Sequence, residues 1–489
     1  MNPPPFEIDG APVRLFAVLD QRVRRTRGSD HQVIGIPQRP AQALAICERQ
    51  RHYYLIGCDL DWQPFTESRH DTLEDAKRQA ENEFTGIGTC WTDISDSLNA
   101  VGSHEADRRM VRPVNRDEVI WSGHAYSYAG YAKMNREILV RLSSSKKVKL
   151  ANAPSSELRL VDDAMQRTLD AIRDAHVSET ATWVRGYTPR SEDWKGRRIC
   201  LTMMETQRVH PDFVRALNGY DECWTPTAWN RETFRTSGVT IPIRVVPLGV
   251  DPNVFRPRQP GELPKAELLS TGRIGARESP AGFVFVTMYQ PTFRKGLPFL
   301  LEAFTSAFEN DPEAALMLAT TIHSHGSFER NLARRSRVRV YGLRGAFSEE
   351  QLANLFSSCH AYVSTSVGEG WNLPLCEAAA CGIPVIAGRH SAHAEILSDE
   401  TAYLFDPQGY GPVPGSEKVC HWYKDQPFAL FGKKSIQQLA TLLRYVKFQY
   451  TEARRKAVAL SRVIRTKYSW DISARTVSAF LDDQGKAFS

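Results

Sequence analysis

The chain has 489 residues, of which 42% are hydrophobic and 24% charged, and its formal net charge is +6. This length exceeds what one hydrophobic core organises, so two to four domains of an ordinary globular protein are expected. Apolar runs such as 283–288 are far shorter than the roughly 20 residues of a membrane-spanning helix. The N-terminus shows no secretory pattern, and nine scattered cysteines suit a reducing compartment, so a cytoplasmic location is expected.

The first 110 residues predict a small α+β domain. A helix is expected over 73–84, with Thr72 as its N-cap. A polar segment over 95–117 predicts a linker. The expected strands are rich in β-branched and aromatic residues and cover 13–19, 43–47 and 53–59. Nothing in this region indicates a chemical role.

Strands alternate with helices in the rest of the chain, a pattern typical of parallel sheets covered on both faces. We expect two doubly wound Rossmann-like domains, 111–250 and 251–489, facing a cleft, with the last helix as a candidate to pack back on the first of them. Ligands of such folds lie beyond the carboxyl ends of the strands. The expected strands cover 119–121, 148–151, 182–185, 199–203, 222–225, 243–247, 282–288, 315–319, 338–341, 361–365 and 384–387. The expected helices cover 131–142, 298–308, 348–356, 375–380, 435–447, 452–466 and 472–481.

The densest group of candidate site residues lies in 364–377, where a buried strand ends in small polar residues and a helix begins near Pro374. The free N–H groups of such a helix start favour an anion. Glu369 would lie on the loop and Glu377 inside the helix, and each could accept hydrogen bonds from paired hydroxyls of a sugar or a ribose. The alternative is that Glu369 caps the helix and Glu377 is a surface residue.

The spacing Glu369-x7-Glu377, continued by 378–387, resembles the signature of the retaining GT-B glycosyltransferases of family 4. The resemblance covers about residues 118–482 and is most specific in the second α/β domain. Residues 1–110 fall outside it. Further matching segments are Arg294-Lys295-Gly296, 300–304, 340–342 and 246–251.

This resemblance implies that Glu377 binds the ribose of a nucleotide and Glu369 the hydroxyls of the donor sugar. Lys295, together with Arg294, would hold the diphosphate, because cations stabilise the charge that develops on the leaving group. No metal and no other cofactor is therefore expected. The loop residues between the two glutamates complete the expected donor site: Gly370, Trp371, Asn372 and Leu373. One departure is Gln290, which stands where the family usually has an arginine.

In the first α/β domain, residues 122–131 occupy the place of the family's glycine-rich loop. By the resemblance, Gly130 would approach the donor phosphates. His124 and Glu205 are candidates for the acceptor side. A plain strand-to-helix turn and a structural histidine are the alternatives.

These features predict a glycosyltransferase that moves a sugar from a nucleotide-diphosphate sugar to an acceptor hydroxyl, with retention of configuration. The acceptor could be a saccharide, a lipid-linked molecule or another hydroxyl compound. The basic helical stretch 444–467 would suit peripheral contact with an anionic surface. Two alternatives remain: a glycosyltransferase that acts on a nucleic-acid base, and a non-catalytic protein that binds sugar nucleotides. The Gln290 departure mildly favours the second, but the intact Glu369, Glu377 and Lys295 speak against it. The sequence identifies neither the donor sugar and its base nor the acceptor, the oligomeric state or a general base.

Overall fold

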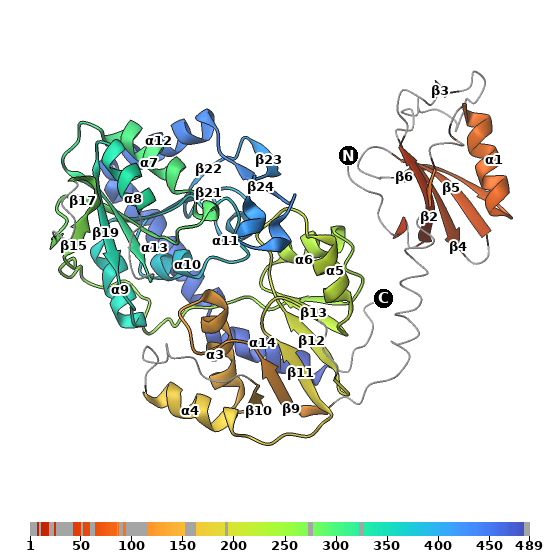
Figure 1. Cartoon of the computed structure of the whole chain (residues 1–489), viewed down its shortest axis with the longest axis horizontal. Helices are drawn as coiled ribbons and strands as arrows, with labels where there is room; N and C mark the ends of the chain where they lie inside the picture. The colour runs from red at the N-terminus through yellow and green to blue at the C-terminus, as the bar shows by residue number, and fades with distance from the viewer. Residues whose placement is uncertain are drawn as a thin grey trace. The chain divides into compact units, whose positions relative to one another are not determined.

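A computed structural model describes most of the chain, which divides into two compact units, Met1–Val111 and Arg112–Ser489. Figure 1 shows both units, and each is considered by itself below. Residues 95–114 of the expected linker lie outside the described residues. The last three residues of that segment, 115–117, begin a strand. The described residues are 7–8, 11–18, 24–25, 43–49, 52–58, 64–85, 87, 91–93, 115–151, 163–190, 194–271, 277–321 and 327–483.

Among its described residues, the first unit combines an antiparallel sheet with the helix α1, as expected for an α+β domain, and β3 pairs with β7 apart from this sheet. The strand order is β1-β2-β4-β5-β6, with β8 paired to β2. The helix α1 (Leu73–Glu83) begins at Thr72, whose side chain accepts a hydrogen bond from the Asp75 backbone N–H, so the predicted cap is confirmed. The strands are β1 (Glu7–Ile8), β2 (Ala11–Val18), β3 (Arg24–Arg25), β4 (Ala43–Arg49), β5 (His52–Cys58), β6 (Pro64–His70), β7 (Phe84–Thr85) and β8 (Thr92–Asp93).

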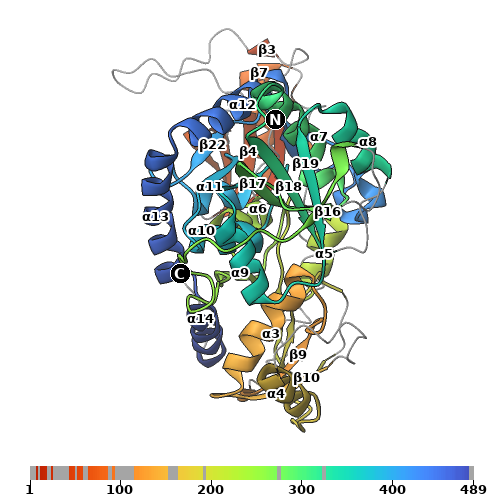
Figure 2. The same ribbon diagram turned by 90° about the vertical axis from the view of Figure 1, so that its left-hand side faces the viewer.

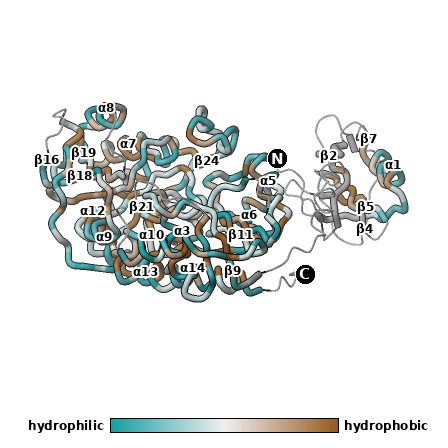
Figure 3. The backbone as a smooth tube through the Cα atoms, turned by 60° about the horizontal axis from the view of Figure 1, so that its bottom comes forward, coloured by the Kyte–Doolittle hydropathy of each residue, from teal (hydrophilic) through white to brown (hydrophobic). Residues whose placement is uncertain are grey.

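The second unit begins with a parallel six-stranded sheet in the order β10-β9-β11-β12-β13-β14. Its strands are short. β13 is fully buried, whereas the edge strand β14 is half-buried, and Figure 3 shows β9 and β11 as mainly hydrophobic. The elements are β9 (Asn115–Ser122), α3 (Gly130–Leu142), β10 (Lys147–Leu150), α4 (Asp163–Arg173), β11 (Ala181–Arg185), β12 (Arg198–Leu201), α5 (Pro211–Asn218), β13 (Glu222–Thr225), α6 (Ala228–Thr236) and β14 (Ile243–Val245). We call this part the first α/β domain.

An eight-stranded sheet follows, in the order β16-β15-β19-β18-β17-β20-β21-β22, and forms the second α/β domain (Figure 2). Only its edge strands β15 and β16 pair in antiparallel fashion. The elements are β15 (Ala266–Leu268), β16 (Arg277–Glu278), β17 (Phe283–Met288), α7 (Leu297–Phe308), β18 (Ala314–Thr320), α8 (Ser327–Arg335), β19 (Arg339–Arg344), α9 (Glu349–Ser358), β20 (Ala361–Ser364), α10 (Leu373–Ala380), β21 (Val385–Gly388), α11 (Ser391–Ile396), β22 (Tyr403–Phe405), β23 (Gly409–Pro412), β24 (Pro427–Leu430), α12 (Lys433–Phe448), α13 (Tyr450–Lys467) and α14 (Trp470–Asp482).

The two α/β domains are joined by chain segments that cross at Gly249. The Val250 N–H donates to the Tyr468 carbonyl at 3.0 Å, and a Cβ at Gly249 would lie 2.2 Å from the Ser469 carbonyl carbon. A glycine is therefore required for this close approach. Beyond the crossing, α14 packs against α3 of the first α/β domain. Among the described residues, no helix is both long and apolar enough to span a membrane.

Candidate functional site

A loop between β20 and α10 carries the first of the two glutamates. Asn372 ends this loop in the left-handed conformation, with φ 82°, and its side chain accepts a hydrogen bond from the Leu375 N–H. Pro374 lies in the first helical turn, where its missing N–H leaves no hydrogen bond unmade. The Asn372 amide nitrogen also lies 2.9 Å from His393 Nε2. Burial lowers the pKa of His393 to about 4, so its neutral ring can accept this hydrogen bond.

Glu369 lies on this loop and is paired with two cations of the same domain. Its carboxylate oxygens lie 2.8 Å from Arg294 Nη1 and 2.7 Å from Lys295 Nζ. Only 5% of Glu369 is exposed. Burial alone would raise the pKa of this carboxyl, but the two cations outweigh it and hold the pKa well below its ordinary value. The residues that the sequence assigned to sugar and to diphosphate are therefore in direct contact.

The turn that bears Arg294 and Lys295 is fixed against the glutamate loop by backbone contacts. Gly296 has φ 65°, and a Cβ there would lie 2.0 Å from the Thr365 carbonyl oxygen, so the turn requires glycine. The Val367 N–H donates to the Arg294 carbonyl at 2.8 Å. The two cations consequently keep one position relative to Glu369.

Glu377 lies in the second turn of α10 and is 3% exposed. Its carboxylate accepts a hydrogen bond of 2.8 Å from Lys133 Nζ, and the same ammonium lies 2.6 Å from Glu349 Oε1. Lys133 belongs to α3 of the first α/β domain, whereas both carboxylates belong to the second. Glu377 is therefore held by a cation from the opposite domain and is not a surface residue.

A cavity of about 360 Å³ lies between the two α/β domains and brings most of the expected site residues together. Gly130, at the start of α3, faces the glutamate loop, because a Cβ there would lie 3.8 Å from Leu373 Cδ1. Gln290, the departure from the family pattern, also lines the cavity. The expected site residues on its wall are Gly130, Glu205, Arg294, Lys295, Glu369, Gly370, Trp371, Asn372, Leu373 and Glu377.

Glu205 enters the cavity wall from the first α/β domain, just after β12. Tyr423 of the second domain donates its hydroxyl hydrogen to Glu205 Oε2 at 2.9 Å. Burial raises the pKa of Glu205; Arg294 lowers it and the nearby Glu369 raises it further. This carboxyl consequently favours its protonated form more than an exposed glutamate does, and it lies close to the charges around Glu369.

His124 does not line the cavity. It is exposed, and its ring contacts the edge of Tyr187, with centroids 5.8 Å apart. Its carbonyl oxygen accepts a hydrogen bond from Asn135 Nδ2 at 2.8 Å. Tyr187 is thus part of the cavity wall, whereas His124 contacts Tyr187 without lining the cavity itself.

The partners of Glu377 and Glu205, Lys133 and Tyr423, were not found from the sequence. Lys133 is 244 positions away from Glu377, and Tyr423 is 218 positions away from Glu205, so neither pair is visible in local patterns. The available signal for Lys133 was a charge on the buried face of an amphipathic helix. Among the described residues, no three His, Cys, Asp or Glu side chains are grouped as metal ligands.

Part of the second α/β domain resembles known proteins in sequence. Residues 280–421, which include the glutamate loop, match the family model described as glycosyl transferases group 1. The MMP alpha-(1->4)-mannosyltransferase of Mycolicibacterium hassiacum is 29% identical over 34% of this chain and 36% of its own length. A probable sucrose-phosphate synthase of Thermosipho melanesiensis is 26% identical over 32% of this chain and 34% of its own length. The matches thus span about a third of these curated relatives.

Solved structures show the fold. The sucrose-phosphate synthase of Thermosynechococcus elongatus superposes with a TM-score of 0.52 at 15% identity, over 74% of this chain and 98% of its own. The apo structure of OtsA superposes with a TM-score of 0.51 at 12% identity, over 75% of this chain and 99% of its own. Both share the arrangement of two Rossmann-like domains called GT-B. This chain is therefore similar to the glycosyl transferases group 1 over residues 280–421, on a GT-B fold.

Proposed function

We propose that the chain transfers a sugar from a nucleotide-diphosphate sugar to a hydroxyl acceptor, with retention of configuration. The observation that carries this proposal is the triad of Glu369, Arg294 and Lys295 on the wall of the cavity between the domains. Cations next to a carboxylate suit a ligand that has a diphosphate next to a sugar. The names of the relatives, a mannosyltransferase and a sucrose-phosphate synthase, support a sugar as the transferred group.

In this proposal, Arg294 and Lys295 stabilise the charge that develops on the leaving diphosphate. Glu369 positions the sugar hydroxyls and forms no covalent intermediate. A carboxylate held by two cations is weakly basic, which suits positioning better than nucleophilic attack. Since the two side chains supply the positive charge, we propose that the reaction needs no metal and no other cofactor.

Glu377 would hold the ribose, and the start of α3 at Gly130 would lie beside the phosphates. Glu205, supported by Tyr423, would contact the acceptor hydroxyl from the first α/β domain. The acceptor is proposed to be a saccharide, a lipid-linked molecule or another hydroxyl compound. Saccharides suit the cavity best, since Tyr128, Tyr131 and Tyr187 lie on the same wall and offer flat faces with polar tips.

The test is a transfer assay with nucleotide sugars and a panel of saccharide acceptors in excess EDTA, followed by proton NMR of the product. We expect a product whose new glycosidic bond has the anomeric configuration of the donor. An inverted product would contradict retention, and activity that appears only with added manganese or magnesium would contradict the metal-free mechanism. Binding of sugar nucleotides without any transfer or hydrolysis would favour the non-catalytic alternative.

We further propose a cytoplasmic protein with peripheral contact to an anionic surface. Arg455, Arg462 and Lys467 of α13 are exposed, and Phe448, at the end of α12, is 66% exposed. Exposed cations together with an exposed apolar side chain suit anionic lipid headgroups. Sedimentation with phosphatidylserine vesicles, and not with phosphatidylcholine vesicles, is the expected result. Equal sedimentation with both kinds of vesicle would contradict the proposed contact with an anionic surface.

A further inference from the structure

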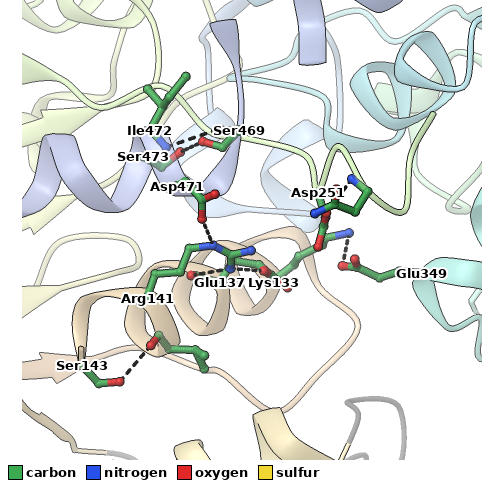
Figure 4. A network of polar contacts seen from close by, with 12 residues as sticks. Lys133, Glu137, Arg141, Ser143, Asp251, Glu349, Ser469, Asp471, Ile472 and Ser473 are labelled. Atoms are coloured by element: carbon green, nitrogen blue, oxygen red, sulfur yellow. Dashed lines mark hydrogen bonds and ion pairs between the residues drawn. The ribbon is translucent and has the colours of Figure 1, made fainter. Parts of the chain in front are cut away.

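Lys133 is a buried ammonium that crosses from one α/β domain to the other. It lies in the first turn of α3 and is 8% exposed. Its Nζ is 2.8 Å from Glu377 Oε1 and 2.6 Å from Glu349 Oε1. Figure 4 shows Lys133 extending from α3 toward Glu349, with Glu137 and Arg141 further along the same helix. The ammonium therefore joins α3 to the start of α9 and to the second turn of α10.

The charges around Lys133 show why it stays ionised. Burial would lower its pKa, but Glu377, Glu349 and Glu137 outweigh this and raise the pKa above its ordinary value. Glu137 is itself paired with Arg141 at 2.7 Å. Lys133 is thus left to compensate the two carboxylates of the second domain, both of which line the cavity.

We propose that Lys133 is a positioning residue for the donor: it holds the Glu377 carboxylate in the orientation that binds the ribose diol. This inference rests on the proposed function and deepens it. A carboxylate oxygen has two lone pairs, so Oε1 can keep the Lys133 contact and still accept from one ribose hydroxyl. Oε2, for which the described residues provide no hydrogen bond, accepts from the other.

The same contact adjusts the charge of the site. A diphosphate donor is an anion, and two uncompensated carboxylates in a cavity of low dielectric would repel it. Lys133 removes this repulsion without occupying both oxygens of Glu377. Because Lys133 belongs to the first α/β domain, the ribose site is complete only when the two domains are closed on each other.

Binding of paired ligands tests the inference. The probe is whichever of UDP, GDP and ADP binds the full-length wild type most tightly, compared by calorimetry with its 2′,3′-dideoxy analogue, which lacks the diol. We expect the wild type to prefer the ribose form by about 10- to 100-fold, the range for a hydrogen bond to a charged group. In Lys133→Met this preference for the ribose form should fall at least about threefold. The separate variant Lys133→Arg keeps a cation and should therefore keep part of the preference.

Glu302→Gln, an exposed carboxylate on α7, is the matched control and should keep the full preference. If Lys133→Met does not fold, the double variant Lys133→Met, Glu349→Gln leaves only one carboxylate unpaired and gives the same comparison. An equal loss for both ligands would overturn the inference, since Lys133 would then act on the diphosphate or on the fold alone. An unchanged preference would overturn it too. Failure of all three nucleotides to bind the wild type would instead contradict the proposed function.

Discussion

The two glutamates of the site are compensated in different ways. Glu369 is paired with Arg294 and Lys295, which belong to its own domain and are fixed by the turn at Gly296. Glu377 is paired with Lys133 of the opposite domain. The first arrangement persists when the domains separate, whereas the second depends on their closure. Under the proposed function, the subsite for sugar and diphosphate would thus be preformed, and domain closure would complete the ribose subsite.

The largest expected effect comes from breaking the arrangement within one domain. Glu369→Gln leaves Arg294 and Lys295 buried without a carboxylate, and removing one partner of a buried ion pair costs about 3–5 kcal/mol. Urea unfolding should show this loss of free energy of unfolding, and transfer activity should be lost with it. Glu302→Gln, at an exposed position of α7 in the same domain, is the control. A loss below about 1 kcal/mol would mean that the triad is not a stabilising unit.

The pH dependence of stability should report the same triad. The pKa of Glu369 in the folded chain lies well below the ordinary 4.5, so the ionised carboxylate stabilises the fold fully above pH 4.5. This contribution is lost as the pH falls below 4.5 toward the folded pKa, by up to about 1.36 kcal/mol per pH unit. The stability gap between wild type and Glu369→Gln should therefore narrow from pH 6 to pH 3. A constant gap would contradict the ion pairs.

The ribose subsite should show a smaller effect. Glu377→Gln keeps the size of the side chain but removes the charge that accepts from the diol and from Lys133. Losing a hydrogen bond to a charged group costs about 1.5–3 kcal/mol, so the affinity for a nucleoside diphosphate should fall about 10- to 100-fold. Calorimetry measures this change. Unchanged affinity would place the ribose elsewhere.

A second contact between the domains should contribute less. The Glu395 carboxylate accepts hydrogen bonds from the N–H groups of Ala228, at 3.0 Å, and Trp229, at 2.8 Å, at the start of α6. An anion at a helix N-terminus is worth about 0.3–1 kcal/mol and is screened by salt. Glu395→Gln should lower the free energy of unfolding by this amount at low salt and by less at 1 M sodium chloride. Glu232→Gln, whose partner Arg235 lies on the same exposed helix face, serves for comparison. A loss that does not respond to salt would contradict the electrostatic account.

The smallest effect is expected from removing the first unit. The division at Val111 and Arg112 predicts that a chain beginning at Arg112 folds and binds a nucleoside diphosphate with affinity within about twofold of the full chain, because separate domains have their own cores. Calorimetry on both chains makes the comparison. An insoluble or non-binding product would show that the first 111 residues belong to the catalytic body.

Local signals predicted much of the fold. The helix expected over 348–356 is α9, which starts with a capping box of Ser348 and Gln351, a signal carried by neighbouring residues. The hydrophobic strands of both sheets were predicted as well, because a run of apolar residues is also a local signal. The hairpin of β23 and β24 was missed, because Gly409 and Gly411 give it no alternating pattern. The strand β6 was missed too, because its polar sequence, PFTESRH, resembles a loop.

The site was predictable where it is contiguous and not where it is assembled. The two glutamates and the Arg294–Lys295 turn lie in short segments with a recognisable spacing. Lys133 and Tyr423 become part of the site only through packing of the two domains. The orientation of His124 could not be predicted either, because it depends on the contact with Tyr187.

A crystal structure of the wild type with a bound nucleotide sugar tests the central claim most directly. The account predicts both ribose hydroxyls on the Glu377 carboxylate with Lys133 still in contact, the diphosphate beside Arg294 and Lys295, and the sugar hydroxyls on Glu369. A ribose that lies away from Glu377, or one that displaces Lys133 from it, would contradict the account.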